Sequence, residues 1–411
     1  MSLAARFADR EDLRLLGPNL RTQASNLLKA DLETLTVQSV QAWIVLGNAY
    51  GADCEWATES LYFGIAIRTA HIIRLHEAHA GETAVEHEVR LRVWWSLYML
   101  DRWSAAGLGT PRQMANRHMS QQLPREEHVF HTLSSSQQDW PEPRRLGMWA
   151  YMITLVEVFG PIQDFNRTLS TGILDQATVT DTVARLGSRL EHWRQSLPSD
   201  LSLDPQTMAL HQQRGHGRTF VALHLGYYHY GTLLYFSYLD GSAAQLPLAD
   251  MYAQRCREYA SALSDLLRTS YEMEGCEVMY NIVGHMAVVS SSVLIHNLLF
   301  GDQRELDNAR GRLESNFRII MKLKSWWPSV DRMKARLFMF QKACLQSIDQ
   351  RTHKVDHWMV EFLLEHGNVL DERSQLEGDT PSPHDVSSTS PTTQAVFERS
   401  RLTRSALSAL N

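Results

Sequence analysis

The chain has 411 residues, of which 44% are hydrophobic and 21% charged, a composition typical of a folded globular protein. Its 40 Lys and Arg residues stand against 46 Asp and Glu, and the formal net charge of −6 excludes a generally basic, phosphate-binding surface. The 4 cysteines form no Cys-x-x-Cys pair, which excludes a zinc module of closely spaced thiolates within this sequence.

Apolar residues recur at helical spacing along nearly the whole chain, as Val37, Val40 and Ile44 do near its beginning. No segment shows the strict alternation of a half-buried strand, so we expect an all-α protein, a large multi-helix regulatory body of antiparallel helix pairs. The predicted helices, in chain order, are 22–30, 36–50, 54–75, 84–105, 146–169, 175–196, 218–239, 249–270, 277–300, 303–325, 330–349 and 354–366.

Two stretches interrupt this pattern. Residues 110–143 are rich in Gln, Pro, Ser and His, which predicts a long surface connection with room for one short helix. Residues 371–393 are rich in Ser, Thr and Pro and bury too little apolar area to offset the entropy of ordering. The predicted organisation is one regulatory body over 1–370 and a disordered tail over 371–411, with either frayed last residues or a short terminal helix.

The most informative segment runs from Ser60 to Met114 and contains two predicted helices separated by a short polar break. Small residues on the first helix, Gly64, Ala66 and Ala70, would let a neighbouring helix approach closely. The large residues Trp94 and Trp95 on the second helix would fill the space between them. We therefore expect these two helices to pack directly against each other.

This segment resembles the middle homology region of the fungal zinc-cluster transcription factors. In the family's usual pattern, a Gly-x-Ala-x-Arg-x-Ala helix ending in Leu-His precedes a Glu-x-x-Arg-Arg-x-Trp-Trp helix ending in Leu-Asp-Arg and a Gly-Arg-Pro turn. This chain departs at Leu91 and Thr110, where the family often has arginine. The matching positions are Gly64, Ala66, Arg68, Ala70, Leu75, His76, Glu88, Arg92, Trp94, Trp95, Leu97, Leu100, Asp101, Arg102, Gly109 and Pro111.

The resemblance implies a transcriptional regulator in a fungal nucleus, with this chain as the regulatory, effector-responsive helical region controlling a metabolic or biosynthetic gene set. Expected partners are proteins of the transcription machinery, a small-molecule effector and a second copy of the chain, with no membrane. The family's zinc cluster uses six cysteines in one short segment, and this sequence has no such segment. Zinc and direct DNA contact would therefore belong to a missing N-terminal module or to a partner.

Asp101 follows an almost unbroken apolar run, so its carboxylate is expected to be buried. A buried carboxylate needs a cation or several hydrogen-bond donors. Arg68 and Arg92 are the first candidates to pair with it, and another arginine is an alternative. A direct contact between this polar group and an effector is the functional alternative.

The motifs of common enzyme classes are absent from the sequence, including Gly-x-Ser-x-Gly, the phosphate-binding loop and the dinucleotide fingerprint. We therefore expect neither a catalytic residue nor a cofactor. A helical enzyme acting on an apolar metabolite and a pure interaction scaffold are the alternatives. His353 and His357 have a spacing that can hold a metal, but a solvated helix face explains them better. The candidates for lining a small-molecule pocket, with core packing as the other interpretation, are Trp103, Tyr227, Tyr228 and Tyr230.

Overall fold

The computed structural model describes residues 1–114, 122–134, 144–241, 248–301, 305–346, 353–372 and 401. Within these ranges the protein is all-α, as predicted, with fifteen α-helices and no strand beyond one isolated bridge between Arg125 and Leu146. Nearly all of the predicted disordered tail and terminal helix lies outside the described residues.

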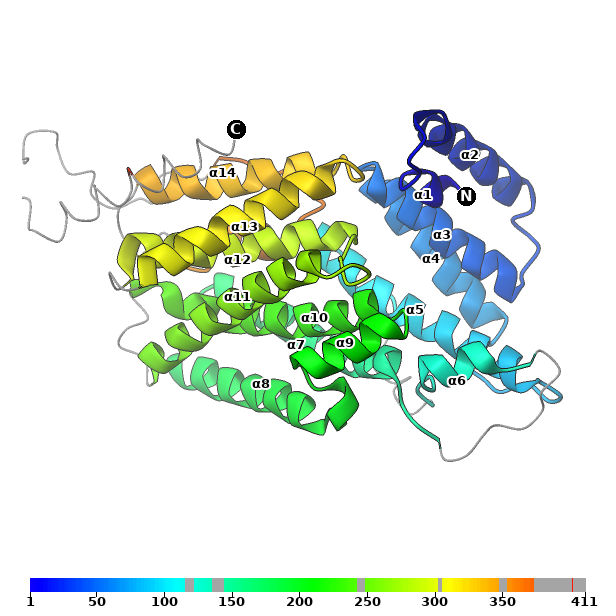
Figure 1. The fold of residues 1–411 in the computed structure, drawn as a ribbon, viewed down its shortest axis with the longest axis horizontal. Helices are drawn as coiled ribbons and strands as arrows, with labels where there is room; N and C mark the ends of the chain where they lie inside the picture. Colours follow the sequence, from blue (N-terminus) through cyan, green and yellow to red (C-terminus); the bar gives the residue numbers. More distant parts are fainter. Residues whose placement is uncertain are drawn as a thin grey trace, which may run out of the picture. The chain divides into compact units, whose positions relative to one another are not determined.

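The chain divides into two compact units (Figure 1). Unit 1 contains residues 1–160 and 326–329, and unit 2 contains residues 161–325 and 330–411. The boundary falls between Gly160 and Pro161, inside one long helix, α7 (Met148–Ser170). The single body predicted over residues 1–370 stays a prediction.

Unit 1 begins with a short helix that packs on a long one and continues with three long helices, each of which contacts the next. Its helices are α1 (Ser2–Ala5), α2 (Glu11–Ala30), α3 (Val37–Ala52), α4 (Trp56–Ile72), α5 (Ala84–Leu108), α6 (Glu127–Thr132) and the first part of α7. Helices α3 and α4 lie side by side in Figure 1. Glycines of α3 make this close packing possible, because a Cβ at Gly47 would lie only 2.6 Å from the Phe63 ring of α4.

Unit 2 is built around a central apolar helix, α12, which packs against α10, α11, α13 and α14. By length and composition α12 could cross a membrane, but 89% of its most apolar window is buried inside the protein, so it is a core helix. The helices of unit 2 beyond α7 are α8 (Gln176–Ser196), α9 (Pro205–Gln213), α10 (Gly217–Tyr235), α11 (Ala249–Glu272), α12 (Asn281–Phe300), α13 (Leu306–Lys324), α14 (Val330–Gln346) and α15 (His357–Leu364).

The predicted helices are found with small shifts, but the beginning of the chain differs. Helix α2 begins at Glu11 rather than near residue 22 and includes Pro18 in its interior. Because proline has no N–H, the hydrogen bond from residue 18 to the carbonyl of residue 14 is missing there. The short helices α1 and α9 were not predicted, since a helix of fewer than three turns shows too little periodicity. Helix α6 is the short helix expected in the 110–143 connection.

Candidate functional site

The region from α4 to the beginning of α7 carries most of the residues that the sequence singles out. Helix α5 begins with a capping box, in which the Thr83 and Glu86 side chains and main chains exchange hydrogen bonds. Arg90, one turn into α5, is buried and donates to the Leu75 carbonyl at 3.0 Å and to the Glu82 carboxylate at 2.7 Å. These bonds fix the turn that joins α4 to α5.

Asp101 is buried, as predicted, but neither Arg68 nor Arg92 is its partner. Its carboxylate oxygens accept the main-chain N–H groups of Gln113 and Met114 at 2.8 and 2.9 Å. The cation beside it is Arg102, at 3.5 Å. Burial raises the pKa of Asp101, while the two amides and the arginine act in the opposite direction.

The first candidates, Arg68 and Arg92, were wrong, whereas the alternative of another arginine is confirmed by Arg102. No local pattern in the sequence indicated the main-chain donors, which reach the carboxylate because the chain turns back after α5. Gly109 makes this return possible: it ends α5 in the left-handed conformation, with φ of 67°. Pro111 follows two residues later, where the chain can no longer be helical.

Arg102 is fully buried and binds the same segment after α5, at Met114. Its guanidinium lies 3.4 Å from the centre of the Tyr98 ring and donates to the Met114 carbonyl at 3.3 Å. Burial lowers the pKa of Arg102. Asp101 and Arg102 together therefore hold both the N–H and the C=O of Met114.

Glu88 and Arg92 hold a later part of the connection. The Glu88 carboxylate accepts a hydrogen bond from the Arg92 side chain at 3.0 Å and another from the main-chain N–H of Arg125 at 2.8 Å. Arg92 in turn donates to the Arg125 carbonyl at 2.8 Å. Glu127 then accepts the N–H groups of Met148 and Trp149 at the beginning of α7. The described part of the 110–143 connection is therefore bound to the helices through buried side chains and is no loose surface loop.

The predicted packing of small residues against tryptophans is only partly correct. Helices α4 and α5 are in direct contact, as expected. Gly64, however, does not lie under a tryptophan: a Cβ there would meet the Gln113 side-chain amide at 3.4 Å. Trp94 contacts the rings of His71 and His76, with centroids 5.2 and 5.1 Å away.

The remaining small and large motif residues are buried in unit 1. The Trp95 indole N–H donates to the Gln122 carbonyl at 2.9 Å and so adds another bond to the connection. Ala66 and Ala70 have no exposed surface. Arg68 differs from the other charged residues of the motif because its side chain is exposed.

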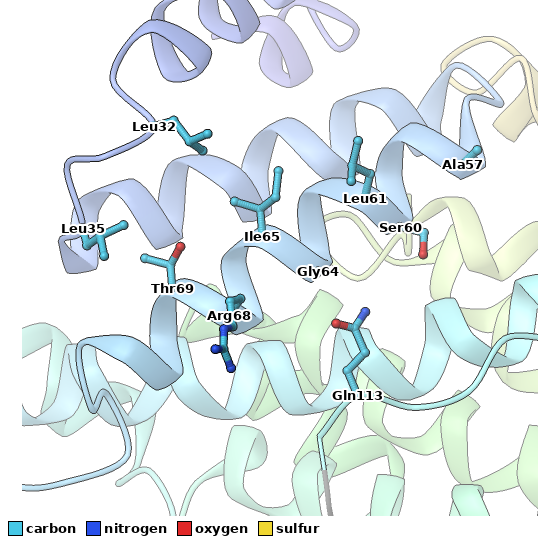
Figure 2. A pocket seen from close by; sticks show the side chains of 10 residues that line it. All are labelled: Leu32, Leu35, Ala57, Ser60, Leu61, Gly64, Ile65, Arg68, Thr69 and Gln113. Atoms are coloured by element: carbon cyan, nitrogen blue, oxygen red, sulfur yellow. The ribbon is translucent and has the colours of Figure 1, made fainter.

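An open groove of about 560 Å³ runs along the outer face of α4 (Figure 2). The α2–α3 loop borders it on one side, and Gln113 borders it on the other. The lining residues are Leu32, Leu35, Ala57, Ser60, Leu61, Gly64, Ile65, Arg68, Thr69 and Gln113.

The four aromatic residues predicted to line a pocket lie elsewhere. Trp103 is half-buried on α5 in unit 1, and the three tyrosines are on α10 in unit 2. Tyr227 stacks on Trp193 with ring centroids 5.5 Å apart and forms a hydrogen bond with the Tyr259 hydroxyl at 3.0 Å. Tyr230 is buried, and Tyr228 is half-buried. None of the four borders the α4 groove, and their role in ligand binding stays a prediction.

The pair His353 and His357 does not form one solvated helix face. His353 is fully buried beside the rings of His296 and Phe340, whereas the His357 side chain, on α15, is 85% exposed. The chain enters α15 only at His357, so the two rings do not share a helix. Among the described residues, no group of three or more His, Cys, Asp or Glu side chains could hold a metal ion.

Sequence reasoning missed three residues that build this region: Glu82, Arg90 and Gln113. Arg90 lies among the charged residues of the first part of α5, so the sequence does not distinguish it from the less buried charged residues around it. Gln113 gives no signal either, because its importance depends on the return of the chain after Gly109.

Comparison with known proteins finds a family model and several curated relatives. Residues 1–195 match the model of the fungal specific transcription factor domain. The chain is 21% identical over 368 residues to the Zn(2)-C6 fungal-type transcription factor FTF1c of Fusarium oxysporum, which covers 79% of this chain and 39% of that protein. It is 25% identical over 214 residues to Activator of stress genes 1 of Saccharomyces cerevisiae, covering 48% and 21% of the two chains.

A third relative is the transcriptional activator protein acu-15 of Neurospora crassa, 25% identical over 209 residues that cover 49% of this chain and 22% of that protein. The chain thus spans about two fifths or less of the length of these relatives. No solved structure matches the chain significantly.

Proposed function

Residues 1–195 belong to the fungal specific transcription factor domain family, and from this premise we propose that the chain is the helical regulatory region of a transcriptional regulator that acts in a fungal nucleus. The observation that carries the proposal is the α4–α5 motif. Its buried carboxylates and guanidinium groups bind the main chain of the segment that follows α5. The motif therefore builds a scaffold.

The same observation favours a regulatory role over an enzymatic one. A catalytic carboxylate has to face a substrate, but both oxygens of Asp101 accept main-chain N–H groups, and Arg102 lies beside them. The one groove along α4 is lined mainly by apolar side chains and carries no acid, histidine or cysteine. Such a surface supports binding rather than general acid–base or nucleophilic chemistry.

We further propose that contact with DNA, and any zinc, belongs to a zinc-cluster segment outside these residues or to a partner protein. The basis is the name of the relatives, which describes Zn(2)-C6 proteins, together with the absence of closely spaced cysteines from this sequence. The proposal also includes a small-molecule effector, a second copy of the chain as dimer partner, and metabolic or biosynthetic genes as the targets of control.

The test is a tethering experiment. The 411-residue chain is fused to an unrelated DNA-binding domain, and transcription of a reporter carrying that domain's site is measured in fungal cells. We expect the fusion to raise or lower reporter output severalfold relative to the DNA-binding domain alone, and a fluorescent fusion of the chain to accumulate in the nucleus. A stable, promoter-bound fusion that leaves the reporter unchanged would contradict the proposal.

A further inference from the structure

The groove along α4 has the dimensions of a helix-binding surface. From Ala57 to Arg68 it follows α4 for about 17 Å, or about three helical turns. Leu61 is 61% exposed and Leu32 is 50% exposed, and both large apolar side chains line the same groove. Ser60 and Gly64 are small residues along the same face, so a second helix could approach α4 closely.

The groove carries a single charged side chain, Arg68, toward one end of its apolar part (Figure 2). Arg68 is exposed, and within the described part of the chain it forms neither an ion pair nor a hydrogen bond. The residues one turn away on α4 are Gly64, Ile65, His71 and Ile72, and none of them is acidic. An occupant with a carboxylate near this end would therefore gain an ion pair that the chain itself does not provide.

The openness of the groove decides which class of ligand it fits. A small molecule is normally held in a concave pocket that buries most of its surface, and this groove would leave such a molecule largely in water. An amphipathic helix, in contrast, needs only an apolar strip on which to lay side chains at i, i+3 or i+4, and i+7 spacing. Leu61, Ile65 and Leu32 provide such a strip.

We propose that this groove binds an acidic amphipathic helix of a partner protein, with its apolar side chains on Leu61, Ile65 and Leu32 and a carboxylate against Arg68. This inference deepens the proposed regulatory function by naming the chemistry of a partner. The α4–α5 motif fixes the rim of the groove, because Asp101 holds the main chain of Gln113 in place.

The last residues of this chain are the main competing occupant, because Leu402, Ala406 and Leu410 have helical spacing. Three arginines lie among them, Arg399, Arg401 and Arg404. Their charge has the same sign as that of Arg68, which favours an acidic partner over this segment.

The experiment measures the binding of labelled helical peptides to the full 411-residue chain by fluorescence anisotropy. The probe is a designed peptide of about four turns with leucines at i, i+3 and i+7 and a glutamate beyond the last leucine. A second peptide has lysine in place of that glutamate, and a third copies residues 396–411. We expect the wild-type chain to bind the glutamate peptide at least about fivefold more tightly than the lysine peptide.

Matched variants locate the binding site. Leu61→Asp is expected to weaken binding of the glutamate peptide at least about fivefold. Leu27→Asp is its control, since Leu27 is 71% exposed on α2 but does not border the groove. Arg68→Glu should reverse the preference, so that the lysine peptide binds more tightly. Arg332→Glu, at an exposed position on α14, should leave the preference unchanged.

Circular dichroism of each variant separates a lost contact from a lost fold. The proposal is overturned if the wild-type chain does not bind the glutamate peptide, if Leu61→Asp leaves its affinity unchanged in a folded protein, or if the 396–411 peptide binds more tightly. Its fate is separable from that of the proposed function. Peptide binding without any reporter effect would refute the regulatory role and leave the proposal for the groove standing. A reporter effect that survives Leu61→Asp and Arg68→Glu would support the regulatory role and count against the groove as the partner site.

Discussion

Buried carboxylates of unit 1 act on the main chain of neighbouring segments. Asp101, Glu88 and Glu127 each accept at least one main-chain N–H from residues that lie 12 or more positions further along. A charged group is stable away from water only when donors surround it, and a main-chain amide is a donor that no substitution except proline removes. Each of these acids therefore fixes the path of a connection that has little regular structure of its own.

Replacement of Asp101 by alanine should strongly destabilise unit 1. The change leaves the N–H groups of Gln113 and Met114 without their acceptor and leaves Arg102 buried without its counter-charge. Breaking a buried pair in this way costs roughly 3–5 kcal/mol of unfolding free energy. Urea denaturation monitored by circular dichroism measures the loss. Asp101→Asn retains one acceptor oxygen and should lose less, while Asp181→Ala, at an exposed site on α8, should change little. Equal stability of the alanine variant and the wild type would show that Asp101 does not hold this segment.

Glu59 makes the stability of unit 1 depend on pH. Glu59 is on α4, and its carboxylate lies against α3, where Gly51 leaves room for it. Among the described residues no cation or hydrogen bond stabilises the charge of this carboxylate. Burial raises its pKa from 4.5 to about 8. The folded state therefore binds this proton more tightly than the unfolded chain, so the unfolding free energy should fall as pH rises from about 4.5 to about 8 and level off above that.

Glu59→Gln removes the titrating group and should remove this part of the pH dependence. The measurement is the unfolding free energy of both proteins across the same pH range, with Glu274→Gln, at an exposed site, as the control. We expect the glutamine variant to gain stability relative to the wild type as pH rises. A constant difference between the two proteins at every pH would contradict the assignment.

Helical periodicity was sufficient to predict the long helices after α2, because each has an apolar face that must be buried, but it found only the second half of α2. It could not show which helix covers which face. The contact of Gly47 with Phe63 depends on the turn between α3 and α4, and sequence reasoning looked instead for close packing at Gly64. Asp101 shows the same limit: its burial follows from its apolar neighbours, but its partners come from a segment whose path no local pattern specifies.

Alanine at two glycines should therefore have opposite effects. At Gly47, a Cβ would lie 2.6 Å from the buried Phe63 ring, and overpacking of this kind costs about 1–3 kcal/mol. At Gly64, the new Cβ meets only the Gln113 side chain at 3.4 Å. There, the better helix propensity of alanine should stabilise the protein by about 0.5–1 kcal/mol. Thermal or urea unfolding of the two variants measures the change in unfolding free energy, which should be a loss for Gly47→Ala and a gain for Gly64→Ala. Destabilisation by Gly64→Ala would place a tightly packed helix where the structure has an open groove.

At the scale of the whole molecule, the arrangement of charged residues does not favour the binding of nucleic acid. The richest basic stretch, Arg312 to Arg336, covers α13 and the first part of α14. Arg312 is paired with Asp265 at 2.7 Å, and Lys324 with Asp331 at 2.8 Å. Arg336 is buried and donates to main-chain carbonyls. The stretch therefore presents a surface of mixed charge.

We expect the isolated chain to bind duplex DNA only weakly, with a Kd above about 10⁻⁶ M at physiological salt. Affinity for a duplex requires several cations free to displace counterions from phosphates, and the formal net charge here is −6. Sequence readout also requires an element that reaches base edges in a groove, and the basic residues of α13 and α14 are partly neutralised by acids of this same chain. Anisotropy of labelled promoter fragments, titrated with the chain at several salt concentrations, measures both affinity and the number of phosphate contacts. Sub-micromolar, sequence-dependent binding that persists at high salt would contradict the prediction and reveal a DNA-binding surface in these residues. Weak, salt-sensitive binding would place DNA recognition in a zinc-cluster segment or a partner, to which these helices would add regulation.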